Sequence, residues 1–163
     1  MTTPDPADRP PAPSYLPELA WPAPGADGLE APYWEATRRG ELVVQRCSAC
    51  RGYQWGPEWI CHRCLSFELG FEPVEPVGRI YSWERSWHPV HPALAETGPY
   101  LVVLVELPGA GGVRMVGNLL GDPTQPVRIG APVVAVFEDH AEYSLVQWRL
   151  SGADPSTPVE RTN

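Results

Sequence analysis

The pattern of apolar and polar residues divides the chain into a polar start, a series of short apolar segments and a polar tail. Residues 1–32 carry nine prolines and almost no apolar periodicity, and residues 151–163 are again polar and contain proline. Such stretches bury too little surface to offset the entropy of ordering them. The first 31 residues are therefore either a tether or an extended segment that lies on a partner, with Tyr15, Leu16, Leu19 and Trp21 as anchors.

A short helix followed by a strand is predicted from the segment PYWEATRRGELVVQR. Pro32 suits the first helical turn, and Arg38 and Arg39 suit the negative end of the helix. Gly40 can adopt the left-handed backbone conformation that ends a helix, and the apolar residues 42–44 then continue as a strand.

From residue 67 onward the pattern indicates β-structure throughout. The apolar segments are strand-length, rich in β-branched and aromatic residues, and separated by Pro, Gly or Asp turns. Five or six such strands with no helix between most of them predict a small closed barrel or a sandwich. The candidate strands are residues 67–74, 78–87, 100–107, 113–120, 132–139 and 143–150.

Composition and charge narrow the classes of function. The 163 residues are 43% hydrophobic, as in globular proteins. The formal charge is -8 and every basic residue is arginine, so we expect no nucleic-acid partner, because phosphate contacts need clustered basic residues. No apolar run approaches the ~20 residues that span a bilayer, and MTTPDPADRPPAPS lacks the pattern of a secretory signal. We expect a cytoplasmic protein without a membrane partner.

All four cysteines lie in one stretch, CSACRGYQWGPEWICHRC, at Cys47, Cys50, Cys61 and Cys64. Two disulfides are one interpretation, but a cytosolic chain rarely keeps them. A redox dithiol is another, but it needs a thioredoxin-like setting. Two Cys-x2-Cys knuckles joined by a short loop are typical of a tetrahedral four-sulfur metal site.

The metal predicted for this site is Zn²⁺ in a structural role. Four protein ligands leave no open position for water, so the site stabilises the fold and does not catalyse. We expect the loop between the knuckles to be a hairpin, with YQW and EWI as its arms and Gly56-Pro57 as its turn. His62 lies inside the second knuckle and is an alternative ligand.

Few other residues in the sequence are candidates for catalysis. The segment WHPVHP places His88 and His91 three residues apart, but Pro89 and Pro92 forbid the helix that a zincin motif requires. The two histidines are either solvated loop residues or contacts for a substrate or partner. No GxSxG, Walker A or GxGxxG motif occurs. We therefore predict no catalytic residue.

Residues 32–150 resemble a known family of two-part proteins with a rubredoxin-like zinc ribbon and a C-terminal acyl-CoA-associated OB-fold. The segments that carry the resemblance are YWEATRRGELVVQRCSACRGYQWGPEWICHRCLS, VEPVGRIYSWERSWHP, GPYLVVLVELPGAGGVRMVGNLLGD and VRIGAPVVAVFED. The resemblance implies a mainly β fold: a short N-terminal helix, a four-cysteine zinc ribbon and a five- to six-stranded OB-fold barrel. We expect a proline-rich segment 1–31, helix and ribbon 32–66, OB-fold 67–150 and a tail 151–163.

The resemblance also implies a partner. Members of the family bind thiolase-fold enzymes that act on CoA thioesters, and similar domains pair with a thiolase-like aldolase in steroid side-chain cleavage. This implies a heterotetramer with an aldolase subunit. A hydratase subunit is a further candidate partner. Candidate contacts for the substrate or the partner are Trp83, Trp87, His88, His91 and Arg38. Two alternatives stay open, a stand-alone acyl-CoA-binding protein and a nucleic-acid binder that combines zinc ribbon and OB-fold.

Overall fold

The structure is a computed structural model, and it describes residues 24–25, 28–88, 92–95 and 98–152. Most of the proline-rich segment 1–31, His91 and residues 153–163 of the tail lie outside the described residues.

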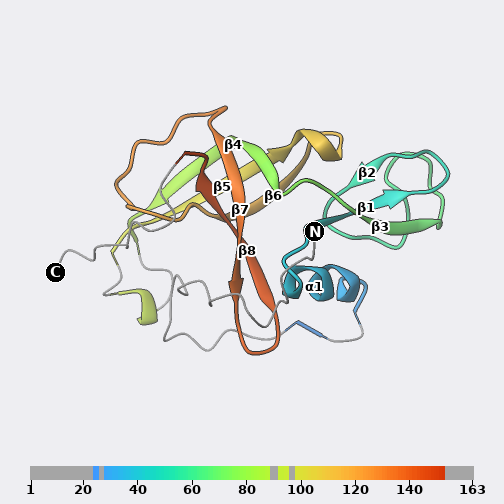
Figure 1. Cartoon of the computed structure of the whole chain (residues 1–163), viewed down its shortest axis with the longest axis horizontal. Helices are drawn as coiled ribbons and strands as arrows, with labels where there is room; N and C mark the ends of the chain where they lie inside the picture. Colours follow the sequence, from blue (N-terminus) through green and yellow to red (C-terminus); the bar gives the residue numbers. More distant parts are fainter. Residues whose placement is uncertain (1–23, 26–27, 89–91, 96–97, 153–163) are drawn as a thin grey trace, which may run out of the picture.

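The described residues form one α-helix and eight strands in two separate sheets (Figure 1). Two short 3-10 helices, η2 and η3, interrupt the loops. Strands β1 to β3 lie at one end of the molecule and β4 to β8 at the other (Figure 1). In chain order the elements are α1 (Ala31–Arg38), β1 (Val43–Cys47), β2 (Tyr53–Gln54), β3 (Leu69–Pro73), β4 (Val77–Ser86), η2 (Pro92–Leu94), β5 (Tyr100–Leu107), η3 (Pro108–Ala110), β6 (Val113–Asn118), β7 (Pro132–Asp139) and β8 (Ser144–Leu150).

The ends of α1 agree with the signals in the sequence. Proline occupies the first turn of the helix, and Arg38 lies in the last turn. Gly40 then adopts a left-handed φ of 74°, which a residue without a Cβ tolerates best. The helix buries Tyr33, Ala36 and Thr37 and packs against β1, β7 and β8. The helix therefore touches both sheets.

The smaller sheet has the strand order β2-β1-β3, with both pairings antiparallel. This sheet corrects the prediction for residues 67–74, which were counted with the barrel strands. β3 pairs along the whole length of β1, from Val43–Pro73 to Cys47–Leu69, and so belongs to the ribbon. The alternating pattern of a strand says which face is buried but does not say which sheet the strand joins.

The larger sheet has the antiparallel order β6-β5-β4-β7-β8. β5 lies in its interior and alternates strictly between buried and half-buried residues, as a barrel strand does. Five strands form the barrel, so the predicted OB-fold class is confirmed with the lower of the two strand numbers.

The barrel is nearly closed where β6 approaches β8. A parallel bridge joins Leu119 to Trp148, and the backbone N–H of Leu120 donates to the carbonyl of Trp148 over 2.7 Å. The buried side chain of Gln147 extends this seam, because its Oε1 accepts from the Asn118 N–H over 2.7 Å. The Gln147 amide also donates to Glu138 Oε2 over 2.9 Å. The Gln147 side chain thus supplies one hydrogen bond between β6 and β8, where the ladder is short, and a second one to β7.

Candidate metal centre and partner surface

The two cysteine knuckles have the same backbone hydrogen bonds. In the first, the carbonyl of Cys47 accepts from the N–H of Arg51 over 2.9 Å, and the Cys47 N–H donates to Gly52 over 3.0 Å. In the second, the carbonyl of Cys61 accepts from Leu65 over 3.0 Å, and the Cys61 N–H donates to Ser66 over 2.9 Å. The two turns are therefore local repeats of one geometry.

Equivalent positions in the two knuckles also share an unusual backbone conformation. Arg51 and Leu65, each directly after the second cysteine of its knuckle, have φ values of 60° and 61°. A left-handed conformation is uncommon for residues other than glycine and is least expected for a bulky side chain. Each knuckle imposes this bend, because its backbone hydrogen bonds tie the residue to the first cysteine of the pair.

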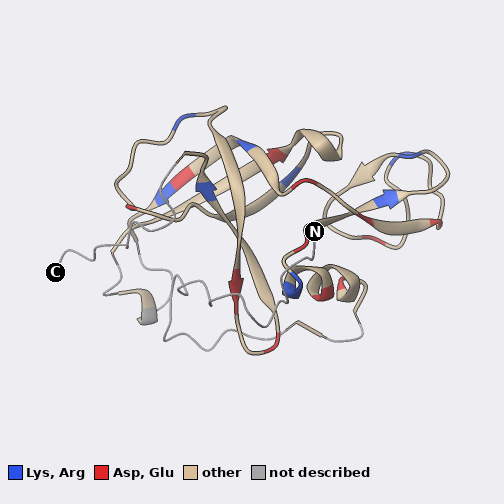
Figure 2. Cartoon of the chain, in the orientation of Figure 1, with Lys and Arg blue, Asp and Glu red and all other residues tan. Residues whose placement is uncertain are grey.

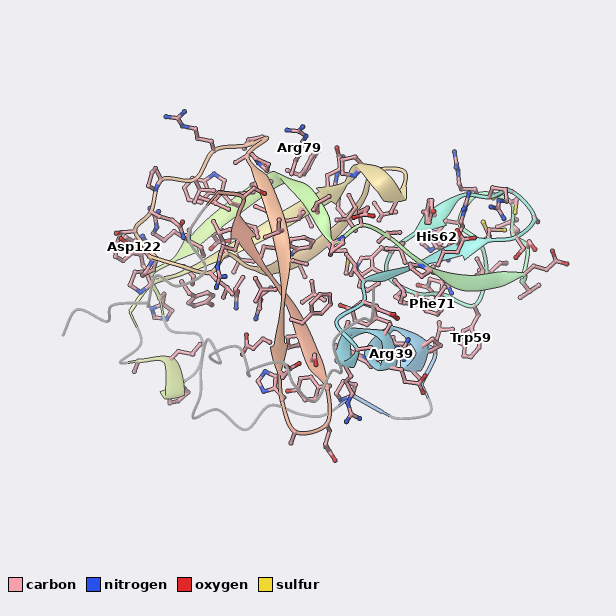
Figure 3. All side chains as sticks on the ribbon, in the orientation of Figure 1. Arg39, Trp59, His62, Phe71, Arg79 and Asp122 are labelled. Atoms are coloured by element: carbon pink, nitrogen blue, oxygen red, sulfur yellow. The ribbon has the colours of Figure 1, made fainter. Side chains whose placement is uncertain are left out.

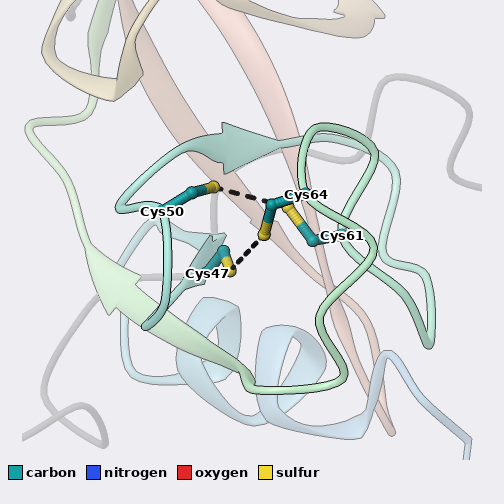
Figure 4. Close-up of side chains that lie close together, drawn as sticks. All are labelled: Cys47, Cys50, Cys61 and Cys64. Carbon is teal, nitrogen blue, oxygen red and sulfur yellow. Dashed lines mark hydrogen bonds between the residues drawn. The ribbon is translucent and has the colours of Figure 1, made fainter.

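The four sulfur atoms fit a tetrahedral metal ion. All four lie within 4.8 Å of one another, and the Cys47–Cys64 and Cys50–Cys61 sulfur pairs are each 3.6 Å apart (Figure 4). With Zn–S bonds of about 2.3 Å, tetrahedral ligand sulfurs lie about 3.8 Å apart, whereas a disulfide needs about 2.05 Å. The cysteines are free thiols in this structure, so the arrangement matches the predicted cage and not the disulfide interpretation.

Backbone N–H groups make part of this cluster favourable for a thiolate. Donation from the backbone of Cys64 and Arg63 lowers the pKa of Cys61 to about 6. The pKa of Cys64 is raised to about 12, because burial and the neighbouring sulfurs outweigh the lowering effect of the Ser66 backbone N–H. Several thiolates in one small volume repel one another unless a cation lies between them. The donor set therefore suits a divalent, thiophilic ion such as Zn²⁺.

The loop between the knuckles is not the predicted hairpin. Tyr53 and Gln54 form β2, but β2 pairs with β1, and residues 58–60 form no strand. Two buried glutamines take the hydrogen bonds that the second arm would have made. Gln45 bonds both the N–H and the carbonyl of Glu58, at 3.0 and 2.9 Å. Gln54 bonds the carbonyl of Ile60 at 3.2 Å and the N–H of His62 at 2.9 Å.

These glutamines are structural residues of the site that sequence reasoning missed. They also bond to each other, since Gln54 Nε2 donates to Gln45 Oε1 over 2.7 Å. The signal that could have found Gln45 is a polar residue directly after the apolar residues 42–44 of the strand, whereas Gln54, in the two-residue β2, carries no such signal. His62, the alternative ligand, is exposed and lies outside the group of four sulfurs.

We expect Gln45→Ala to loosen residues 58–62 while the cysteines stay in place. The variant removes both hydrogen bonds to Glu58 and one to Gln54, leaving buried polar groups unpaired at a cost of about 1–3 kcal/mol. Amide hydrogen exchange of residues 58–62 should accelerate, with little change in the barrel strands. Unchanged exchange in this loop would contradict the role assigned to Gln45.

The candidate contacts on β4 lie at its exposed end. Trp83 is exposed with the Arg85 guanidinium 5.5 Å from its ring centre, and Trp87 and His88 follow in the exposed segment after the strand. Arg85 is itself held by the carbonyls of Pro123 and Gln125, at 2.7 and 2.8 Å. The end of β4 therefore exposes aromatic side chains, and Arg85 beside Trp83 is held in place by two backbone carbonyls.

Arg38 lies elsewhere. It lines a surface pocket of about 390 Å³ between α1 and the turn that joins β7 to β8, together with Trp34, Glu35, Glu142 and Tyr143. The end of β4 leads instead towards η2, well away from α1 (Figure 1). The predicted contact residues are thus divided between two regions.

Charged residues of both signs are interspersed over both sheets (Figure 2). Several form local pairs, such as Arg46 with Glu72 in the ribbon and Arg114 with Glu106 in the barrel. The first pair lowers the pKa of Glu72, chiefly through the hydrogen bond from Arg46. In the described part of the chain, no helix is long and apolar enough to cross a membrane.

The fold and the site together define a protein in which a four-cysteine ribbon of the zinc-ribbon type is joined to a five-stranded OB-fold barrel. Residues 34–70 match the family described as the rubredoxin-like zinc ribbon domain of ChsH2, and residues 71–138 match its C-terminal OB-fold domain. The chain belongs to this family, which is also known as DUF35.

Two curated relatives are longer proteins. One, from Thermomonospora curvata, is a probable enoyl-CoA hydratase alpha subunit, 37% identical over 147 residues that make up 90% of this chain and 43% of the relative. The other, from Mycobacterium tuberculosis, is a 3-oxo-4,17-pregnadiene-20-carboxyl-CoA hydratase alpha subunit, 30% identical over 71% of this chain and 36% of the relative. The chain spans less than half the length of these relatives.

Two solved structures share the fold. A chain of the Ltp2-ChsH2(DUF35) aldolase is 36% identical with a TM-score of 0.68, over 80% of this chain and 99% of that chain. A DUF35 protein of unknown function from Sulfolobus solfataricus is 11% identical with a TM-score of 0.56, over 77% of this chain and 87% of that chain. The second likeness concerns the fold alone.

Proposed function

We propose that this chain is a non-catalytic subunit that binds a thiolase-fold aldolase and helps to complete or cover its acyl-CoA site. The observation that carries the proposal is the similarity to the solved aldolase chain, which extends over 99% of that chain at 36% identity. The reaction proposed for the complex is retro-aldol cleavage of a steroid side-chain β-hydroxyacyl-CoA.

The chemistry of the site supports a structural role for this chain within such a complex. We assign Cys47, Cys50, Cys61 and Cys64 to one structural Zn²⁺, which leaves no thiol free to act as a nucleophile. Among the described residues, these cysteines are also the only group of three or more His, Cys, Asp or Glu side chains close enough to share a metal ion. In this proposal the reacting groups come from the partner.

The exposed aromatic residues provide a physical reason for the second subunit. An acyl-CoA combines an apolar acyl part with an anionic head, and a β-surface carrying Trp83 and Trp87 is suited to cover the apolar part. Covering the site excludes water, which protects a carbanion-like intermediate from side reactions. His88, His91 and Arg38 stay candidate contacts for the substrate or the partner.

The proposal predicts that activity needs both proteins. Co-expression with the Ltp2 component of the solved aldolase should yield a heterotetramer that cleaves a steroid β-hydroxyacyl-CoA, while neither protein alone does so. Light scattering on the purified complex checks the stoichiometry. Full activity of Ltp2 without this chain would refute the proposal. Tight binding of acyl-CoA by the isolated chain in calorimetry, without complex formation, would favour the stand-alone binder instead.

The relatives suggest a further partner. Both curated relatives are named as hydratase alpha subunits, so we include a hydratase subunit among the expected partners. The total charge of -8 disfavours nucleic acid as a partner, because contacts to phosphate need clustered basic residues.

A further inference from the structure

Three exposed apolar side chains flank the second knuckle, one before it and two after it. Trp59 is 71% exposed, Leu65 is 67% exposed and Phe67 is 78% exposed. Exposed apolar residues scattered singly need no explanation, but a group of them on one small module is typical of an interaction site. We call these three residues the ribbon tip.

Backbone hydrogen bonds close the knuckle that lies between the two parts of the ribbon tip. The N–H of Leu65 donates to Cys61, and the N–H of Cys61 donates to Ser66, so the first residue of the knuckle lies beside the two residues that follow it. Trp59 precedes this pairing and Phe67 follows it. Figure 3 shows Trp59 on the ribbon side of the molecule, below the ribbon strands in this view.

The ribbon tip is held rigidly although its side chains are exposed. Both neighbours of Trp59 are tied to buried glutamines, Glu58 to Gln45 and Ile60 to Gln54. The left-handed backbone of Leu65, at φ 61°, is kept by the knuckle and directs a bulky apolar side chain to the surface. An anchor that is already ordered loses little entropy when it binds.

From these observations we infer that the ribbon tip is the anchor by which this chain docks on its enzyme partner, inserting Trp59 and Phe67 into an apolar pocket of that protein. This inference rests on the proposed function and names the surface that the complex uses. Buried aromatic side chains near the centre of an interface commonly carry most of the binding free energy.

The size of the ribbon tip favours a larger partner over a second copy of this chain. The three side chains present on the order of 400 Å² of apolar surface, about half of the ~800 Å² per partner in a stable interface. The remainder has to come from contacts around the tip, which a large enzyme subunit can provide.

The shape and chemistry of the chain also disfavour a second copy. A protruding tip needs a concave, apolar site, whereas the surface pocket between α1 and the β7–β8 turn also holds the charged side chains of Glu35, Arg38 and Glu142, beside Trp34 and Tyr143. Insertion of one copy into the next would also be a heterologous contact, which forms open filaments unless the rotation closes a ring.

A double substitution in the ribbon tip tests the inference. The 163-residue chain is titrated with purified Ltp2, once as the wild type and once as the variant Trp59→Ala/Phe67→Ala. Calorimetry gives the dissociation constant of each complex. The matched control is Val116→Ala/Ile129→Ala, which removes two side chains of similar exposure, 65% and 71%, from the barrel. We expect the tip variant to bind on the order of 100-fold or more weakly, and the control to stay within about threefold of the wild type.

Each outcome has a defined meaning. Unchanged zinc content and thermal midpoint show that the tip variant is folded, and a single Trp59→Phe variant, which keeps an aromatic anchor, should retain most of the affinity. Equal affinities of the tip variant and the wild type would overturn the ribbon tip as the docking site and leave the proposed function intact. No binding of wild-type chain to Ltp2 would overturn both. A wild-type chain that dimerises alone, together with a monomeric tip variant, would overturn the inference in favour of self-association.

Discussion

Replacing Cys61 by serine is expected to abolish zinc binding and unfold the ribbon end of the molecule. Cys61 is buried at 1% exposure, and its sulfur lies 3.6 Å from that of Cys50. Structural zinc contributes about 10–16 kcal/mol of apparent binding free energy in small modules. Loss of one thiolate therefore removes a large part of the free energy that holds β1, β2 and the two knuckles together.

Elemental analysis and hydrogen exchange measure this effect. Wild-type protein should carry about one zinc ion per chain, and removing it with a strong chelator should have the same effect as Cys61→Ser. The matched control is Ala49→Ser, which introduces the same side chain at an exposed position of the first knuckle. If Cys61→Ser kept the wild-type thermal midpoint and slow exchange in β1, the structural role of the metal would be refuted.

Removal of the indole of Trp148 should produce the largest loss of stability in the barrel. This side chain is completely buried at 0% exposure and lies at the junction of β6 and β8. A Cβ built on Gly117 would come within 2.8 Å of the ring, so the indole fills the space that this glycine leaves open. Trp148→Ala leaves a large cavity, and we expect the free energy of unfolding to fall by about 3–5 kcal/mol.

Denaturant unfolding of two further variants tests this explanation. Trp148→Phe should be less harmful than Trp148→Ala, because it keeps a ring and removes an indole Nε1 that has no hydrogen-bond partner in the structure. Trp87→Ala, at a position that is 69% exposed, should change the stability by less than about 0.5 kcal/mol. Similar losses for the two alanine variants would show that the barrel does not depend on the Trp148 indole.

Local features were readily predicted from the sequence. The ends of α1 follow from Pro32 and Gly40, because both act through their own backbone conformation. The four-sulfur cluster follows from the cysteine spacing, because two residues between cysteines suffice to place both sulfurs on one turn. The strands of the barrel follow from apolar, β-branched segments separated by turn residues.

Features that depend on distant residues were missed or assigned wrongly. The loop of residues 53–60 has the composition of a hairpin, but Gln45 on β1 takes the hydrogen bonds of Glu58. β3 reads as another barrel strand, but its partner is β1, more than twenty residues earlier in the chain. The ribbon tip could not be recognised either, because Trp59 and Phe67 look like ordinary core residues until their exposure is known.

The sequence by itself determined the class of fold, the position of the helix and the set of cysteines that cluster together, since each depends on interactions within a few residues. Only the tertiary structure decided which sheet each strand joins and how the barrel closes at Trp148. It also separated Arg38 from Trp83 and Trp87 and left Trp59, Leu65 and Phe67 exposed on a rigid support. The reason is physical: burial and pairing are set by contacts between segments far apart in the chain, and local sequence does not encode which segments meet.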